Sequence, residues 1–203
     1  MSDRLGIVIA SSNEGKIKEI KQIFGGLDVE LLTPSDIDYS LPDIEETGQT
    51  YLENALLKAH AVCKATGLPA MSDDSGIEVD VLDGAPGVHS ARFAGKGASD
   101  EQNNQKLIAM LEGKPSGERT ARYRCVAVLV MPDGSEFAAI GSCEGAIGFD
   151  AKGSGGFGYD PWFLPRGYEV CMAELSAEEK DSISHRGKAF RGLADQVWRR
   201  LLR

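Results

Sequence analysis

Two adjacent aspartates, Asp73 and Asp74, are the residues whose type and spacing most directly indicate chemistry. They lie where an apolar run stops, before a Ser-Gly pair and an alternating run over residues 77–82, so we expect them at the end of a strand. Adjacent anions repel, and their burial is costly unless a cation or hydrogen bonds compensate. Mg²⁺ commonly lies between carboxylates and substrate phosphates, which makes it the expected cation. An ordinary turn formed by Asp, Ser and Gly is the alternative.

A polar segment after the first predicted strand is a candidate phosphate site. Its residues are Ser11, Ser12, Asn13, Glu14, Gly15 and Lys16. It joins an apolar run at residues 5–10 to a helical pattern, and backbone N–H groups at the start of a helix can hold phosphate. Lys16 adds a positive charge, although the spacing of a Walker A loop is absent. A plain helix cap followed by a solvated lysine is the alternative.

Periodicity predicts the elements that position these residues. Capping boxes predict three further helix starts, at Thr50-x-x-Glu53, Ser99-x-x-Gln102 and Ser176-x-x-Glu179. Further strands are expected at residues 29–32, 119–130 and 135–141, and the last two flank a Pro-Asp-Gly turn typical of a hairpin. The first hairpin arm alternates between two faces, which indicates a mixed sheet. A break at residues 184–187 precedes a last helix with a wide apolar stripe.

Two glycine-rich segments interrupt this pattern. Residues 83–95 form a loop too long for a simple connection, which indicates a site wall or a contact surface. Residues 153–158 match the dinucleotide fingerprint formally, but no helical pattern follows, so we reject that interpretation. Phe157 in this loop is placed to stack on a flat ring, with a core position as the alternative. Lys180, His185 and Arg186 form a compact basic group suited to a phosphate or a base edge.

Composition excludes several classes of protein. The chain has 31 acidic and 22 basic residues and a net charge of −9, which argues against binding to nucleic acids or anionic membranes. No apolar run approaches the ~18 residues that span a bilayer. The four cysteines form no Cys-x-x-Cys pair, so we expect a reduced, cytoplasmic protein. Its length and its 42% hydrophobic content indicate a single domain over residues 1–203.

Taken together, the polar segments resemble the inosine/xanthosine triphosphate pyrophosphatase family. The matching motifs are Ser11-Ser-Asn-Glu-Gly-Lys16, Glu45-Glu-Thr-Gly-Gln-Thr50, Glu53-Asn-Ala55, Lys58-Ala59, Ser72-Asp-Asp-Ser-Gly76, Gly84-Ala-Pro-Gly87, Ser90-Ala-Arg92, Gly155-Gly-Phe-Gly-Tyr-Asp-Pro161, Ala173-Glu-Leu175, Glu179-Lys180 and Ile183-Ser-His-Arg186. They follow the family's order from residue 10 to residue 188. The first motif begins with Ser11 where the family often has Thr, which keeps the hydroxyl.

The resemblance implies an α/β fold with an elongated mixed β-sheet flanked by helices, and two lobes with a nucleotide cleft between them. It also implies a homodimer that uses Mg²⁺ to hydrolyse aberrant purine nucleoside triphosphates (ITP, dITP and XTP) to a monophosphate and pyrophosphate. The residues predicted for catalysis are Asp74, as the base, with Lys16 and Lys58. Glu46 and Asp74 are predicted to bind the metal, and Asp73 is predicted to have a secondary role beside Asp74.

The remaining site residues are predicted to contact the substrate. Ser11 to Lys16 are assigned to the triphosphate. The other predicted nucleotide contacts are Ser75, Phe157, Gly158, Tyr159, Asp160, Lys180, His185 and Arg186, and the last two are assigned to the base. A 6-oxo purine presents an acceptor where adenine presents a donor, so donors in the site would favour inosine and xanthine. One mismatched buried contact costs ~1–3 kcal/mol, or roughly tenfold to hundredfold in selectivity.

Two other functions stay open from the sequence. One is a pyrophosphatase for a different modified nucleotide. The other is a nucleotide sensor that binds without hydrolysis, although the acidic group of Asp73, Asp74 and Glu46 argues against it. A protein that only binds a triphosphate has no need for that much negative charge beside it.

Overall fold

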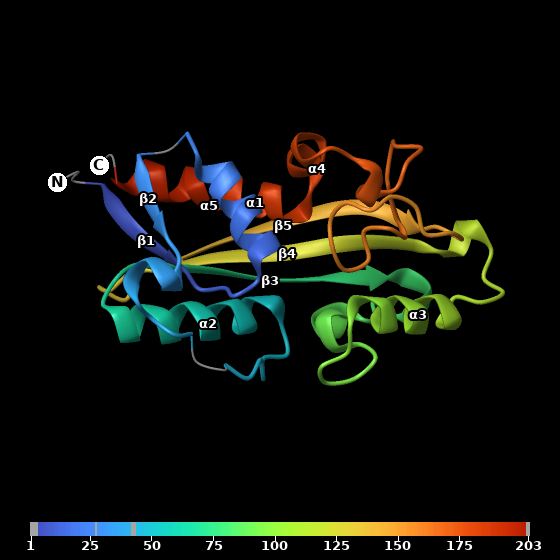
Figure 1. Ribbon diagram of the computed structural model, residues 1–203, viewed down its shortest axis with the longest axis horizontal. Coiled ribbons are helices and arrows are strands. Elements are labelled where there is room, and N and C mark those ends of the chain that lie inside the picture. Colours follow the sequence, from blue (N-terminus) through green and yellow to red (C-terminus); the bar gives the residue numbers. More distant parts are fainter. Residues whose placement is uncertain (1–3, 27, 42–43, 202–203) are drawn as a thin grey trace. The chain divides into compact units, whose positions relative to one another are not determined.

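Two compact units make up the protein. The computed structural model describes residues 4–26, 28–41 and 44–201 (Figure 1). The first unit comprises Met1–Asp74, Cys125–Gly141 and Arg186–Arg203, and the second comprises Ser75–Arg124 and Ser142–His185. The single domain, the two lobes and the cleft expected from the sequence stay predictions.

The described residues form one mixed sheet of six strands. They are β1 (Leu5–Ile9), β2 (Val29–Leu32), β3 (Ala70–Val79), β4 (Thr120–Val130), β5 (Glu136–Ile147) and β6 (Phe163–Pro165), in the order β2-β1-β3-β4-β5-β6. Strand β1 runs parallel to β2 and β3, whereas β5 and β6 are antiparallel. The predicted mixed α/β fold with helices flanking a sheet is therefore confirmed.

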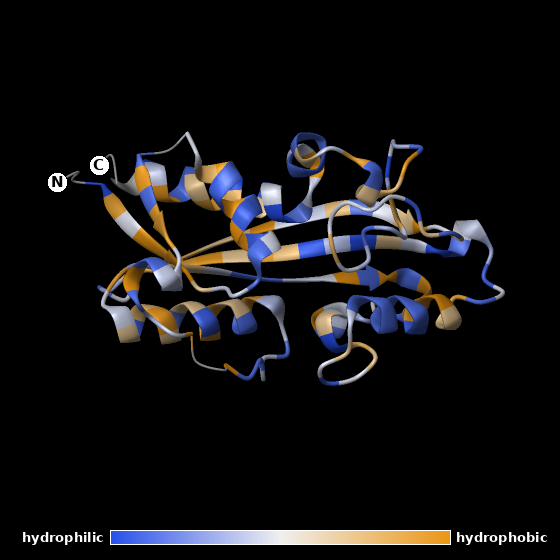
Figure 2. Cartoon of the chain, viewed as in Figure 1, coloured by the Kyte–Doolittle hydropathy of each residue, from blue (hydrophilic) through white to orange (hydrophobic). Residues whose placement is uncertain are grey.

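Three helices enclose the strands of the first unit. Helices α1 (Glu14–Phe24) and α5 (His185–Leu201) lie on one face, and α2 (Tyr51–Thr66) lies on the other (Figure 1). Figure 2 shows that each of these helices carries both hydrophobic and hydrophilic residues along its length. Two clusters of buried side chains result. One joins α1 and α5 to the sheet through residues such as Ile20 and Phe190, and the other joins α2 through residues such as Ala59.

The second unit has its own core. Helix α3 (Asp100–Met110) contributes Leu107 and Leu111, the latter just beyond its end, to a cluster with buried strand residues that include Ile77 and Phe163. Helix α4 (Ala177–Ile183) follows near the end of this unit. The short 3₁₀ segments of the two units are Pro34–Ile37, Asp80–Leu82, Gly87–Arg92, Ser116–Glu118 and Met172–Glu174. The predicted long loop at residues 83–95 therefore contains a 3₁₀ turn.

The helix starts predicted from capping boxes are confirmed. Thr50 caps α2, Ser99 caps α3 and Ser176 caps α4, and each box is completed by the residue at the third helical position. At the other end of α2, Gly67 adopts φ = 69°, a left-handed conformation in which glycine ends a helix without strain. These local signals fix the helix that carries Asn54 and Lys58.

Replacement of Thr50 with Ala is expected to lower the free energy of unfolding by about 1 kcal/mol, because the Glu53 N–H loses the hydroxyl that accepts its hydrogen bond at 3.2 Å. Urea unfolding measures this loss. The Thr50→Ser variant keeps the hydroxyl and should stay within a few tenths of a kcal/mol of wild type. Equal losses in both variants would contradict the cap.

Three predicted boundaries were wrong. Asp73 and Asp74 do not end a strand but lie within the continuous β3, because buried partners on both faces hold them in an extended backbone. Helix α5 begins at His185, so only Ser184 separates it from α4; the buried contacts of Arg186 outweigh the poor helix propensity of Gly187. Strand β5 continues to Ile147 because Gly145 lets Leu164 and Phe163 of β6 approach closely.

In the ranges that the structure describes, none of the helices is long and apolar enough to cross a membrane.

Candidate active site

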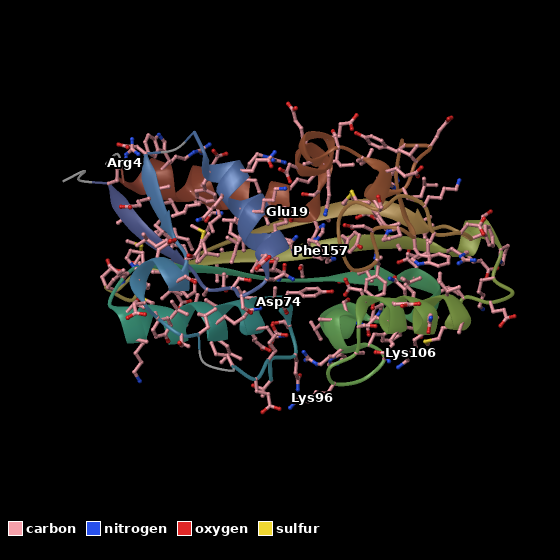
Figure 3. All side chains as sticks on the ribbon, in the orientation of Figure 1. Arg4, Glu19, Asp74, Lys96, Lys106 and Phe157 are labelled. Carbon is pink, nitrogen blue, oxygen red and sulfur yellow. The ribbon has the colours of Figure 1, made fainter. Side chains whose placement is uncertain are left out.

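The alternation of side chains along β3 directs the two aspartates to opposite faces of the first unit. Asp73 contacts side chains of α1 and α5, and Asp74 contacts side chains of α2. Figure 3 labels two members of these groups, Glu19 on α1 and Asp74 on the α2 side of the strand. The pair therefore forms two chemically separate groups.

Asp73 is the centre of a buried ion cluster that contains Lys16, Glu19 and Arg186. Its Oδ2 accepts from Lys16 Nζ at 3.1 Å and from Arg186 Nε at 3.2 Å, and Arg186 Nη1 also donates to Glu19 at 2.5 Å. The Asp73 and Arg186 side chains are only 1% and 2% exposed. Burial disfavours the Asp73 carboxylate, but the positive charges of Lys16 and Arg186 outweigh it and hold its pKa well below the usual range. Asp73 therefore stays ionised beside its two cationic partners.

Asp74 belongs to a second cluster, which contains Asn54, Lys58 and Glu46. Its Oδ2 accepts from Asn54 Nδ2 at 3.0 Å, and its Oδ1 lies 3.8 Å from Lys58 Nζ, which donates to Glu46 at 2.7 Å. Burial raises the pKa of Asp74, and the Glu46 carboxylate raises it further against the opposing charge of Lys58. Burial works against the Lys58 ammonium, but Asp74, Asp73 and Glu46 raise its pKa above its ordinary value. A carboxyl with a raised pKa is suited to accept a proton near neutral pH.

The polar segment from Ser11 to Lys16 lies at the N-terminus of α1. The Asn13 side chain accepts from the Lys16 backbone N–H at 3.0 Å, and the Asn13 N–H donates to Ser11 Oγ at 3.2 Å. Ser12, Asn13 and Glu14 are exposed. The segment thus presents a helix N-terminus beside the Lys16 ammonium, an arrangement that favours an anion. Its role in binding triphosphate stays a prediction.

In the second unit, Asp160 gathers several of the predicted nucleotide contacts. Lys180 Nζ donates to its Oδ2 at 2.9 Å, the Phe157 N–H donates to the same oxygen at 3.0 Å, and the Tyr123 hydroxyl donates to Oδ1 at 3.2 Å. The Lys180 ammonium lies 4.7 Å from the centre of the Phe157 ring. This group holds a half-buried aromatic ring and a buried lysine in fixed relation.

The remaining predicted contacts of this unit have different surroundings. Tyr159 is buried in the core, and its hydroxyl donates to the Ser90 carbonyl at 2.8 Å. His185 is buried with its ring stacked on Tyr123 at 4.6 Å. The Gly158 N–H and carbonyl bond to side chains of α3, and Ser75 is half-buried on β3. Contact of each with a nucleotide stays a prediction.

The structure brings together only part of the predicted site. Lys16 shares a cluster with Arg186, and Lys58, Glu46 and Asp74 share another, all in the first unit. The role of Arg186 toward the base stays a prediction; its guanidinium donates hydrogen bonds to Asp73 and Glu19.

Five residues in these groups had no predicted role: Glu19, Asn54, Asp100, Asn104 and Tyr123. Glu19 lies one turn after Lys16, and Asn54 lies one turn before Lys58, so helical spacing from a predicted site residue is the signal that could have found them.

The donors around Asp74 fit a hard divalent cation. Within the part of the chain that the structure describes, no group of three His, Cys, Asp or Glu side chains is placed to hold a metal ion. Mg²⁺, however, often takes only one or two protein carboxylates and completes its shell with waters and substrate phosphates. Asp74 and Glu46 are close enough for the negative charge of Glu46 to raise the pKa of Asp74. A cation between these two carboxylates would relieve that repulsion.

Comparison with known proteins gives a consistent result. The model of the Ham1 family matches residues 7–196. The chain is 47% identical over 191 residues to a dITP/XTP pyrophosphatase of Geobacter sulfurreducens, covering 94% of this chain and 96% of the relative. It is 48% identical over 193 residues to a dITP/XTP pyrophosphatase of Streptomyces coelicolor, covering 94% and 96% of the two chains.

A solved structure supports the same assignment. A HAM1 protein from Coxiella burnetii superposes with a TM-score of 0.86 at 39% identity, covering 96% of this chain and 99% of that one. The chain belongs to the Ham1 family. The resemblance inferred from the motifs is therefore confirmed.

Proposed function

We propose that this protein hydrolyses aberrant purine nucleoside triphosphates, namely ITP, dITP and XTP, to a nucleoside monophosphate and pyrophosphate. The observation that carries the proposal is the group of Asp74, Glu46 and Lys58, a carboxyl with a raised pKa held beside a second carboxylate and an ammonium. The names of the relatives from Geobacter sulfurreducens and Streptomyces coelicolor give dITP and XTP and so support two of these substrates. Removal of such nucleotides would keep deaminated purines out of the nucleotide pool.

The residues of the first unit have complementary roles in this reaction. Ser11 to Lys16 bind the triphosphate through backbone N–H groups and the Lys16 ammonium. Asp74 accepts a proton from water as the water oxygen bonds to the α-phosphorus, and the bond to the bridging oxygen breaks to release pyrophosphate with the electron pair. Lys58 keeps Asp74 and Glu46 oriented and partly neutralised. Asp74 and Glu46 would hold Mg²⁺, which when bound neutralises charge on the departing pyrophosphate.

The residues of the second unit act on the nucleoside. Phe157 offers a face for stacking on the purine, held by Asp160 and Lys180. Ser75, Gly158, Tyr159 and His185 complete the proposed contacts of this unit. His185 and, from the first unit, Arg186 are assigned to the base. A donor facing the 6-oxo group would be left unpaired by adenine, at a cost of ~1–3 kcal/mol. We also infer that the protein is a cytoplasmic homodimer with no nucleic-acid partner.

Pyrophosphate release from ITP, XTP, dITP, ATP and GTP at equal concentration, with Mg²⁺ and with EDTA, tests the proposal. We expect fast release from the first three with Mg²⁺, at least about tenfold slower release from ATP, and almost none with EDTA. Tight binding of ITP without release would identify a nucleotide sensor instead. Release restricted to a different modified nucleotide would move the proposal to that substrate.

A further inference from the structure

Two side chains of α3 form hydrogen bonds to the backbone of Gly158, in the loop that carries Phe157. Asp100 Oδ2 accepts from the Gly158 N–H at 2.7 Å, and Asn104 Nδ2 donates to the Gly158 carbonyl at 2.9 Å. Residues 100 and 104 are one helical turn apart and so lie on the same face of α3. Both backbone polar groups of one loop residue are thereby bonded to one helix.

Gly158 lies in a segment whose backbone has an unusual conformation. Gly158 has φ = 63°, and Gly156 before it has φ = 74°. A Cβ on Gly156 would collide with the Asp160 carboxylate, which also accepts from the Phe157 N–H. The direction of the Phe157 ring thus depends on a short segment in which the residues on both sides of Phe157 have positive φ. A flexible glycine on its C-terminal side would leave that direction poorly defined unless another element fixed it.

The same helix also holds the neighbouring glycine-rich loop. The Asn103 amide accepts from the Ala94 N–H at 2.8 Å and donates to the Ala91 carbonyl at 3.1 Å. Lys106 Nζ donates to the Phe93 carbonyl at 2.6 Å. Four polar residues of α3, namely Asp100, Asn103, Asn104 and Lys106, therefore bond to two loops of the second unit. The Tyr159 hydroxyl joins these loops through the Ser90 carbonyl.

We propose that Asp100 and Asn104 are positioning residues that fix the Gly158 peptide groups, and through them the stacking geometry of Phe157 on the purine. The inference rests on the proposed function, because it assigns Phe157 to the substrate. Asp100 and Asn104 themselves do not touch the reacting atoms. Their loss therefore acts on substrate binding and selectivity and leaves the hydrolytic step almost unchanged.

The chain supplies a matched control. Glu101 and Gln105 lie on α3 at the same spacing, are exposed, and bond to each other at 3.3 Å. Asp100 and Glu101 are both acidic residues in the first turn, so replacing either one removes a similar favourable interaction with the helix N-terminus. Only Asp100 reaches the Gly158 N–H. The comparison of Asp100→Ala with Glu101→Ala separates the loop contact from the stability of the helix.

The test measures kcat and KM for ITP, together with the Kd for ITP in EDTA, in Asp100→Ala, Asn104→Leu, Glu101→Ala and Gln105→Leu. We expect KM and Kd to rise about tenfold in the first two, with kcat within about threefold of wild type, and no change in the controls. Asp100→Asn keeps an acceptor and should recover most of the affinity. Hydrogen exchange at the Gly158 amide should speed up in Asp100→Ala and stay slow in Asp100→Asn.

The outcomes separate this inference from the proposed function. A wild-type protein that binds ITP but releases no pyrophosphate would overturn the proposed hydrolysis, and the Kd ratios would still decide the role of α3. Unchanged KM and Kd in both α3 variants, or an equal rise in the controls, would overturn the positioning role. A fall in kcat at constant KM would do the same, because it would place these residues in the chemical step.

Discussion

Replacement of Asp74 with Asn is expected to lower kcat for pyrophosphate release by about 10²–10⁴-fold while the protein stays folded. The amide cannot accept the proton of the attacking water, and it removes one of the two carboxylates proposed to hold Mg²⁺. Its carbonyl oxygen can still accept from Asn54 Nδ2, so the internal hydrogen bond survives. Steady-state kinetics with saturating ITP and Mg²⁺ measure the effect.

The matched control is Asp150→Asn, which makes the same chemical change at an exposed position. It should leave kcat within about twofold of wild type, since surface substitutions have small effects. Circular dichroism and the unfolding midpoint of the Asp74 variant should match wild type closely. A kcat near the wild-type value in that variant would remove Asp74 from its assignment as base and as metal ligand.

Replacement of Arg186 with Met is expected to lower the free energy of unfolding by about 3–5 kcal/mol. Arg186 is fully buried and compensates both Asp73 and Glu19. Methionine fills a similar length but removes the guanidinium from both Asp73 and Glu19, while the ion pair of Asp73 with Lys16 stays in place. Denaturant unfolding at neutral pH measures the loss.

The Arg4→Met variant controls for the loss of an ion pair as such. Arg4 and Asp28 are 57% and 68% exposed, so breaking their contact should cost only about 0–1 kcal/mol. The double variant Asp73→Asn/Arg186→Met should recover part of the stability, because it removes one of the uncompensated charges. A loss in the Arg186 variant no larger than that in the Arg4 variant would contradict the buried cluster.

Local signals predicted the helices well, because a capping box involves residues only three positions apart. Thr50 with Glu53 and Ser99 with Gln102 are examples, and both were found as expected. The hairpin of β4 and β5 could be predicted equally well from the sequence, because its turn residues lie between its two strands. The environment of Arg186 could not be predicted in this way, since its partners Asp73 and Glu19 lie 113 and 167 positions away in the sequence.

The wrongly predicted end of the strand at Asp73 also shows that neighbours in sequence do not determine the backbone there. The letters Asp-Asp-Ser-Gly favour a turn when only neighbours in sequence are considered. The backbone stays extended because Lys16 and Arg186 hold Asp73, while Asn54 and Lys58 hold Asp74. Which of the two carboxylates joins Lys16 and Arg186, and which is the proposed base, therefore depends on tertiary contacts that a local pattern does not contain.

The placement of the two carboxylates also makes the site sensitive to strand register. Parallel pairing sets Val8 opposite Ala70 and Ile9 opposite Met71, and this fixes which face each aspartate occupies. A slip of one residue would exchange the faces. In one direction Asp74 would take the place of Asp73 among the cations, and a serine would take the place of the proposed base. The ion cluster would then be filled, but the group of Glu46 and Lys58 would lack its carboxyl from β3. The short connection between α2 and β3 is consequently a poor place for evolution to add or remove a residue.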